Sequence, residues 1–122
     1  MIDLFFFLGV SSLLVHEMDA VDKKEWHFLF VLRKLPDHGA LRWFIGLHLP
    51  IYLGLLALVA AGPSSTVHLI EGLVDGFLIA HAGLHERFSV KGARAFANVF
   101  SRSLIWLAAG FGAVHLVILL VG

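Results

Sequence analysis

Cysteine is absent from the 122 residues of this sequence, which excludes disulfides, thiolate metal ligands, iron–sulfur clusters and cysteine nucleophiles. An excess of charge is absent as well, because nine basic residues balance nine acidic ones, and no basic run marks a nucleic-acid site. Hydrophobic residues are abundant instead: they make up 59% of the chain, and the mean hydropathy is +0.89. This composition lies outside the range of soluble domains and predicts one small membrane domain, residues 1–122.

Four apolar stretches are each about long enough to cross ~30 Å of hydrocarbon as a helix that rises ~1.5 Å per residue. They run over residues 4–21, 43–61, 67–88 and 95–121. The sequence therefore predicts an all-α fold, an integral membrane four-helix bundle.

The connection between the first two spans carries an apolar patch flanked by basic residues. The patch consists of Trp26, Phe28, Leu29, Phe30 and Leu32. This pattern favours an amphipathic helix that lies in the membrane interface and ends at Pro36.

The basic residues predict the orientation of the spans. All nine lie in or beside the first and third connections, whereas the second connection and both ends of the chain have none. The positive-inside rule therefore places the two basic connections in the cytoplasm and both termini on the opposite side.

The third span carries five ionisable side chains on an arc of roughly 140°, at ~100° of rotation per residue. They are His68, Glu71, Asp75, His81 and His85. Ionisable groups are costly inside a bilayer, so a helix with five on one face indicates a functional site. Glu71 and Asp75 require a cation or a proton to neutralise them. They are the expected catalytic residues, either as a general base or as ligands of a second metal.

Histidine and carboxylate side chains from three spans reach one depth near the cytoplasmic ends of the helices, which predicts a metal site there. His81 and His85 are four residues apart and can bind one ion from one helical face. The expected ligands of this inner site are His16, Glu17, Asp19, His48, His81 and His85. An outer layer offers a second site, made of His68, Glu71, Asp75 and His115. These donors suit iron or zinc, and their number allows two ions.

The segment HEMDAVDKKEW, followed by a helix that contains EGLVDG, resembles the uncharacterised bacterial membrane proteins grouped by an HXXEE-type signature. The resemblance covers the first and third spans, and it implies a small multi-span metal protein of the bacterial inner membrane. The residues present are His16, Glu17 and Asp19, with Glu25 further on, and either Asp19 or Glu25 takes the role of the second acid. No particular reaction is implied.

These features favour a membrane-embedded metal-dependent enzyme that acts on a lipid-soluble molecule, with a non-haem iron oxidoreductase preferred because the donors could hold two metals. The expected partners are the lipid bilayer and that molecule; nucleic acid is not expected, and a homo-oligomer stays open. One alternative is a proton or cation transporter that uses the ladder from His68 to His85. Another is a b-type haem protein, with His48 and His81, or His68 and His115, as axial ligands. A purely structural subunit would leave the cost of the buried charges unexplained.

Overall fold

The computed structural model describes residues 2–61, 64–90 and 98–122, and the described part of the chain is almost entirely helical. Its α-helices are α1 (Ile2–Asp22), α2 (Asp37–Ala61), α3 (Ser64–Val90) and α4 (Val99–Val121). All four are long and apolar enough to cross a membrane, which confirms the predicted all-α fold of a multi-pass membrane protein.

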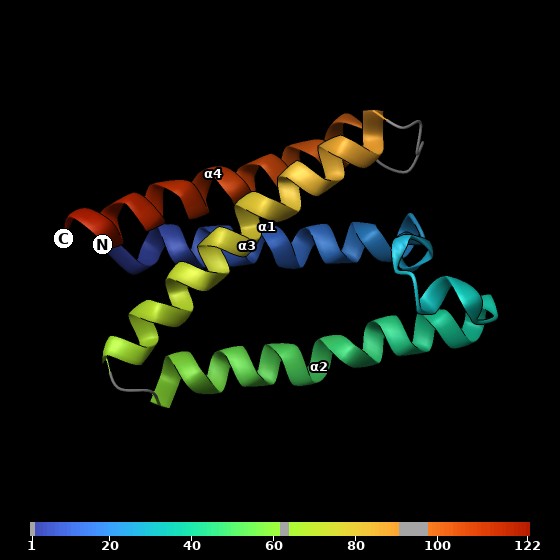
Figure 1. Cartoon of the computed structure of the whole chain (residues 1–122), viewed down its shortest axis with the longest axis horizontal. Helices are drawn as coiled ribbons and strands as arrows, with labels where there is room; N and C mark the ends of the chain where they lie inside the picture. Colours follow the sequence, from blue (N-terminus) through green and yellow to red (C-terminus); the bar gives the residue numbers. More distant parts are fainter. Residues whose placement is uncertain (1, 62–63, 91–97) are drawn as a thin grey trace.

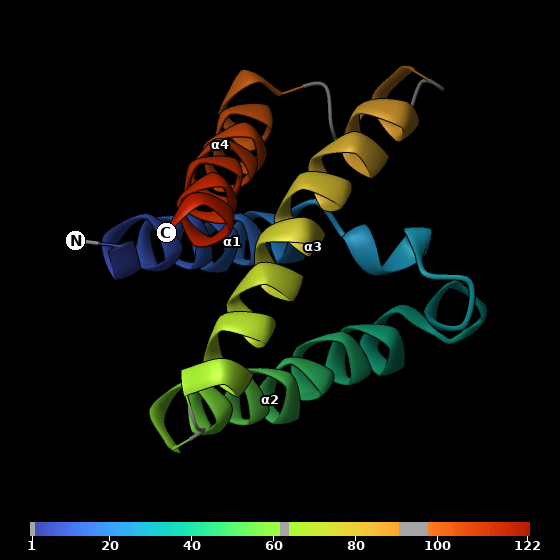
Figure 2. The same ribbon diagram turned by 60° about the vertical axis from the view of Figure 1, so that its left-hand side comes forward.

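The four helices form a bundle in which α1, α3 and α4 pack closely, while most of α2 stands apart from α1 (Figure 1). The view in Figure 2 shows the same arrangement, with α3 crossing between α2 and α4. Close packing depends on Gly9 and Gly112, because a Cβ added to either would lie 3.0 or 3.2 Å from the Cδ1 atom of Leu78. Small residues at such crossings let membrane helices approach closely. One part of the core therefore lies where α1, α3 and α4 meet.

Successive helices run in opposite directions along the bundle. In Figure 1 both termini lie at the left-hand end, together with the end of α2 and the start of α3. The end of α3, the start of α4 and the connection after α1 lie at the opposite end. This alternation is what four successive membrane spans require.

The connection between α1 and α2 differs from the predicted interfacial α-helix. It contains two short 3-10 helices, η1 (Glu25–Phe28) and η2 (Leu32–Lys34). Trp26 and Leu32 are both buried in a cluster with Ala20, Ala40 and Phe44. In one continuous α-helix, two residues six positions apart would point roughly 120° away from each other. Dividing the segment into two pieces lets both side chains reach the same cluster.

The helix bounds also differ from the predicted spans. α2 begins at Asp37 rather than at residue 43, because the Pro36 carbonyl already accepts a bond from the Ala40 N–H at 2.9 Å. α3 extends beyond 67–88 at both ends. Before α4, Asn98 caps the helix by accepting a hydrogen bond from the Phe100 N–H at 3.0 Å. The start predicted at residues 95–97 falls outside the described residues.

Candidate metal centre

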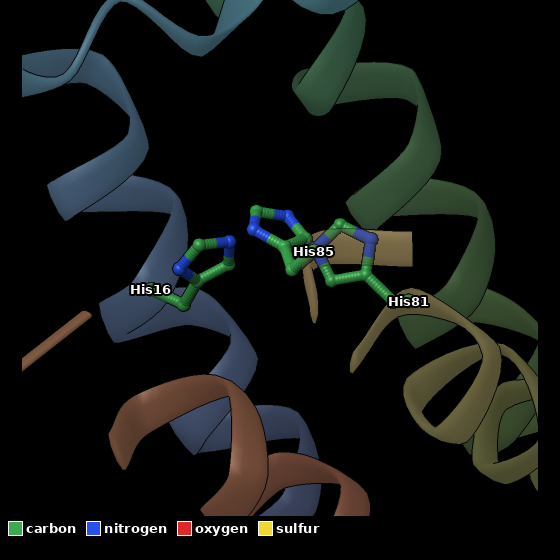
Figure 3. A group of neighbouring side chains, drawn as sticks. All are labelled: His16, His81 and His85. Carbon is green, nitrogen blue, oxygen red and sulfur yellow. The ribbon is translucent and has the colours of Figure 1, made fainter. Parts of the chain in front are cut away.

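Three histidines from two helices converge near one end of the bundle. His16 projects from α1, and His81 and His85 project from α3, with the three rings turned toward one another (Figure 3). One ring nitrogen of each lies within 4.8 Å of the others. The ring centroids are 4.4 Å apart for His81–His85 and 4.8 Å apart for His16–His85. The four-residue spacing places His81 and His85 one turn apart on α3, and helix packing adds His16. We call this group the histidine cluster.

Glu25 reaches the histidine cluster from the connection after α1. Its Oε2 atom lies 3.7 Å from His16 Nε2 and 3.6 Å from His85 Nε2. The chain turns at Lys24, whose φ of 55° lies in the left-handed region, and η1 then packs against α1. This turn carries Glu25 inward, where only 8% of its surface stays exposed. Both separations exceed the length of a normal hydrogen bond, so the atoms converge without bonding to each other.

Several donor atoms of Glu25, His16 and His81 are buried without a hydrogen-bond partner among the described residues. Within the described part of the chain, the Oε1 atom of Glu25, both ring nitrogens of His16 and the Nε2 atom of His81 have no hydrogen-bond partner. A buried polar atom left without a partner costs about 1–3 kcal/mol. Burial, and then the nearby charges of Glu17 and Asp19, raise the pKa of the Glu25 carboxyl to about 8. A cation shared by these side chains would satisfy one donor atom of each of them.

Glu25 was not among the ligands expected from the spacing of the spans. That expectation rested on depth along the predicted helices, and Glu25 lay beyond the end of the first one. The resemblance provided the only signal, because it offered Glu25 as one of two candidates for the second acid.

The other residues expected at the inner site lie outside the histidine cluster. His48 Nε2 is 3.0 Å from Glu17 Oε2, so these two side chains bond to each other across α1 and α2. Asp19 accepts a hydrogen bond from the Ser101 hydroxyl on α4 and lies 3.7 Å from the Lys23 ammonium. A single shell of six ligands is therefore not what the structure shows. Glu17, Asp19 and His48 were expected at the depth of the inner site. Their side chains bond instead to partners on neighbouring helices.

The outer layer contains a buried pair. His115 Nδ1 on α4 lies 2.7 Å from Asp75 Oδ2 on α3, and neither side chain has any exposed surface. Glu71 is also buried, one turn before Asp75, whereas His68 is exposed. Phe6 of α1 packs against the His115 ring. Among the described residues, only the histidine cluster has three or more ligand side chains close enough to share an ion. The expected second metal site is therefore not assembled here.

A cavity of about 180 Å³ adjoins the histidine cluster. Its polar lining comes from Glu17, Glu25, His81 and His85, and its apolar lining from Phe28, Leu29, Phe44 and Leu84. An apolar space beside buried ligand side chains is typical of a small-molecule site.

The protein family described as a family of unknown function, DUF6713, matches residues 2–122, so the chain belongs to this family. No curated protein matches the chain, and no solved structure does. The family assignment carries no activity, and the function has to be argued from the site.

Proposed function

We propose that this family member is a membrane-embedded metalloprotein whose ion is bound by His16, His81, His85 and Glu25. The observation that carries the proposal is the convergence of four nitrogen and oxygen donors from α1, η1 and α3. Ionisable groups inside a membrane bundle are costly, and they mark functional sites unless they neutralise one another. Three imidazoles and one carboxyl group around a shared centre fit a cation better than they fit packing.

The spacing of the donors suits a single ion. With metal–nitrogen bonds of ~2.0–2.1 Å, two donors of a tetrahedral site lie about 3.4 Å apart. The separations of 3.6 and 3.7 Å from Glu25 to His85 and His16 lie close to this value. Three nitrogen donors and one oxygen donor, without sulfur, suit zinc or non-haem iron. Because the outer layer does not assemble a second group of ligands, we propose one ion rather than two.

The surroundings of the histidine cluster favour an enzyme acting on a lipid-soluble molecule. Four of the eight residues that line the adjoining cavity are Phe or Leu, and the cavity lies within a bundle of membrane-spanning helices. A bound zinc would supply Lewis acidity there, and a bound iron would supply redox chemistry. The residues of the chain would hold the ion, and Phe28 and Leu84 would exclude water from one side of it.

The position of the cluster also suggests where in a cell the reaction takes place. The cluster lies near the end of the bundle that carries the basic connections. By the positive-inside rule this end faces the cytoplasm, with both termini outside. The resemblance described above adds the bacterial inner membrane to this proposal.

The test is the metal content of the protein purified in mild detergent, measured by mass spectrometry together with an absorption spectrum. We expect near-stoichiometric iron or zinc without a haem Soret band, and loss of that metal in His16→Ala, His81→Ala and His85→Ala. His68→Ala is the matched control, because this exposed histidine lies on the same helix as His81. Metal bound equally by all four variants would refute the site, and a Soret band would indicate haem instead.

Proton transfer is a second candidate function, and one observation favours it. The Asp75–His115 pair is fully buried between α3 and α4, at a depth where a bare charge is costly. Such a pair can hold a proton within the bilayer. If the protein conducts protons, Asp75→Asn should abolish proton flux into liposomes while Glu86→Gln, which changes an exposed ion pair with Arg102, leaves it intact. Equal flux in wild type and Asp75→Asn would exclude this function.

A further inference from the structure

A groove of about 400 Å³ lies between α1 and α2, on the side of the molecule away from α4. Its walls are mostly apolar: Leu14, Met18 and Val21 come from α1, and Ile45 comes from α2. Met18 is 75% exposed and Ile45 is 52% exposed, so the groove is open to the surroundings of the protein. Along membrane-spanning helices those surroundings are the acyl chains of the bilayer.

A neutral polar pair interrupts this apolar groove. His48 Nδ1 contacts the Phe44 carbonyl, which can only accept, so Nδ1 carries the hydrogen. His48 Nε2 then shares one proton with Glu17 Oε2 at 3.0 Å, either as imidazole with a protonated carboxyl or as imidazolium with a carboxylate. The pair is neutral in both forms. Glu17 keeps a second oxygen, and Tyr52, whose ring lies tilted beside that of His48 with 5.5 Å between the centroids, also lines the groove.

The groove and the cavity beside the histidine cluster share a wall. Glu17 and Phe44 line both spaces, and Glu25, His81 and His85 line the cavity on the far side. Phe44 is 8% exposed, and its ring lies 4.7 Å from that of His48. A polar group bound at Glu17 would therefore lie beside a wall that the groove shares with the cavity at the histidine cluster.

We infer that the groove binds a single-chain, uncharged amphiphile with a terminal hydroxyl, its alkyl chain along α1 and α2 and its hydroxyl at the Glu17–His48 pair. A hydroxyl can donate a hydrogen bond to the second Glu17 oxygen, because the His48 ring nitrogens are already engaged by Phe44 and by Glu17 Oε2. Among the described residues that line the groove none is Lys or Arg, so a phosphate head group would stay uncompensated. A reaction of the hydroxyl at the metal centre rests on the proposed function, but binding of the amphiphile in the groove does not.

The test is photocrosslinking of the full chain in phosphatidylcholine nanodiscs. The probe is a long-chain fatty alcohol with a diazirine on its alkyl chain, and the comparison probes are the same alkane without the hydroxyl and a diazirine phosphatidylcholine. Labelled positions are mapped by mass spectrometry. We expect the alcohol to label 14–21 and 44–52 in preference to other lipid-facing residues, at least about tenfold above the alkane and the phospholipid, which corresponds to about 1.4 kcal/mol.

Two variants test separately the binding of the alkyl chain and the binding of the hydroxyl. Leu14→Trp should fill the groove and remove the preferential labelling. Its matched control is Leu47→Trp, since Leu14 and Leu47 are 39% and 44% exposed but Leu47 lies outside the groove. His48→Leu should lower labelling of the groove by the alcohol to the level of the alkane.

Each outcome decides the inference. Equal labelling by alcohol, alkane and phospholipid would show an ordinary contact with bilayer lipid and overturn it, as would an effect of Leu14→Trp no greater than that of Leu47→Trp. Metal content is measured on the same preparations. An absence of metal would overturn the proposed function, and an absence of preferential labelling would overturn the groove, so the two failures are distinguishable.

Discussion

Glu25 and His16 face each other across the end of α1, with 3.7 Å between Oε2 and Nε2. They are nine positions apart, and the chain brings them together only because it reverses at Lys24, in the left-handed region. The distance is too long for a hydrogen bond and close to the separation of two ligands of one metal ion. Glu25 therefore adds a fourth donor beside the histidine cluster.

Glu25→Gln should weaken metal binding at least about tenfold, because removal even of a residue that only orients a ligand costs 10–100-fold in affinity. Gln has nearly the same shape but is a weaker oxygen donor and carries no charge. The measurement is a metal titration of the detergent-solubilised protein by competition with a chelator. Asp22→Asn is the control, since the Asp22 side chain is 74% exposed. Equal affinities in both variants would remove Glu25 from the site.

The stability of the metal-free protein should fall as the pH rises from about 5 to 8, and Glu25→Gln should remove part of that fall. The folded protein raises the pKa of Glu25 from 4.5 to about 8. Between these values the unfolded chain has already released the proton that the folded chain still holds, so raising the pH favours unfolding. Above about pH 8 both states are ionised, and the contribution of Glu25 becomes constant. The measurement is the thermal midpoint by tryptophan fluorescence in both proteins; parallel pH profiles would contradict the assignment.

Alanine substitutions at Gly9 and Gly112 should have non-additive effects on stability, because both would crowd Leu78. A Cβ on either glycine would lie 3.0 or 3.2 Å from the same Leu78 methyl group, which is buried between them. Leu78 can move away from one added methyl, but not from both. The double variant Gly9→Ala/Gly112→Ala should therefore lose more stability than the sum of the single variants, by about 1 kcal/mol or more.

The control for this cycle comes from two glycines with open space around them. A Cβ at Gly46 or Gly110 meets nothing within 4 Å. Alanine there should leave stability unchanged or raise it by up to about 1 kcal/mol each, because alanine is the better helix former. Denaturation in SDS-containing mixed micelles measures all of these variants, and additive effects at Gly9 and Gly112 would disprove the shared contact.

Removing one member of the Asp75–His115 pair should destabilise the protein more than removing both members. His115→Phe leaves the Asp75 carboxyl buried without its partner, and loss of one member of a buried pair costs about 3–5 kcal/mol. In Asp75→Ala/His115→Phe both members of the pair are removed, so the double variant should be more stable than His115→Phe. The same micelle denaturation measures this order. A double variant less stable than His115→Phe would indicate that Asp75 has another partner that matters more.

Much of the fold follows from the order of residues. Four apolar stretches of sufficient length predict four spans, and four spans place both termini at one end of the bundle, as Figure 1 shows. The spacing of His81 and His85 alone places them on one face of α3, since residues four apart are neighbours on a helix. The depth of His16 follows in the same way, because a helix rises ~1.5 Å per residue from its first residue.

The sequence by itself therefore determined how deep each polar side chain lies, and only the tertiary structure decided which way each one points. Depth depends on position along a helix, whereas direction depends on how each helix is rotated against its neighbours. That rotation pairs His48 with Glu17 and Asp19 with Ser101, although His48, Glu17 and Asp19 were all expected at the depth of the inner site. Glu25 joined the histidine cluster because burial of Trp26 and Leu32 in one cluster folds the connection into two short helices. No pattern along the chain specifies that packing, because it depends on surfaces contributed by α1 and α2 together.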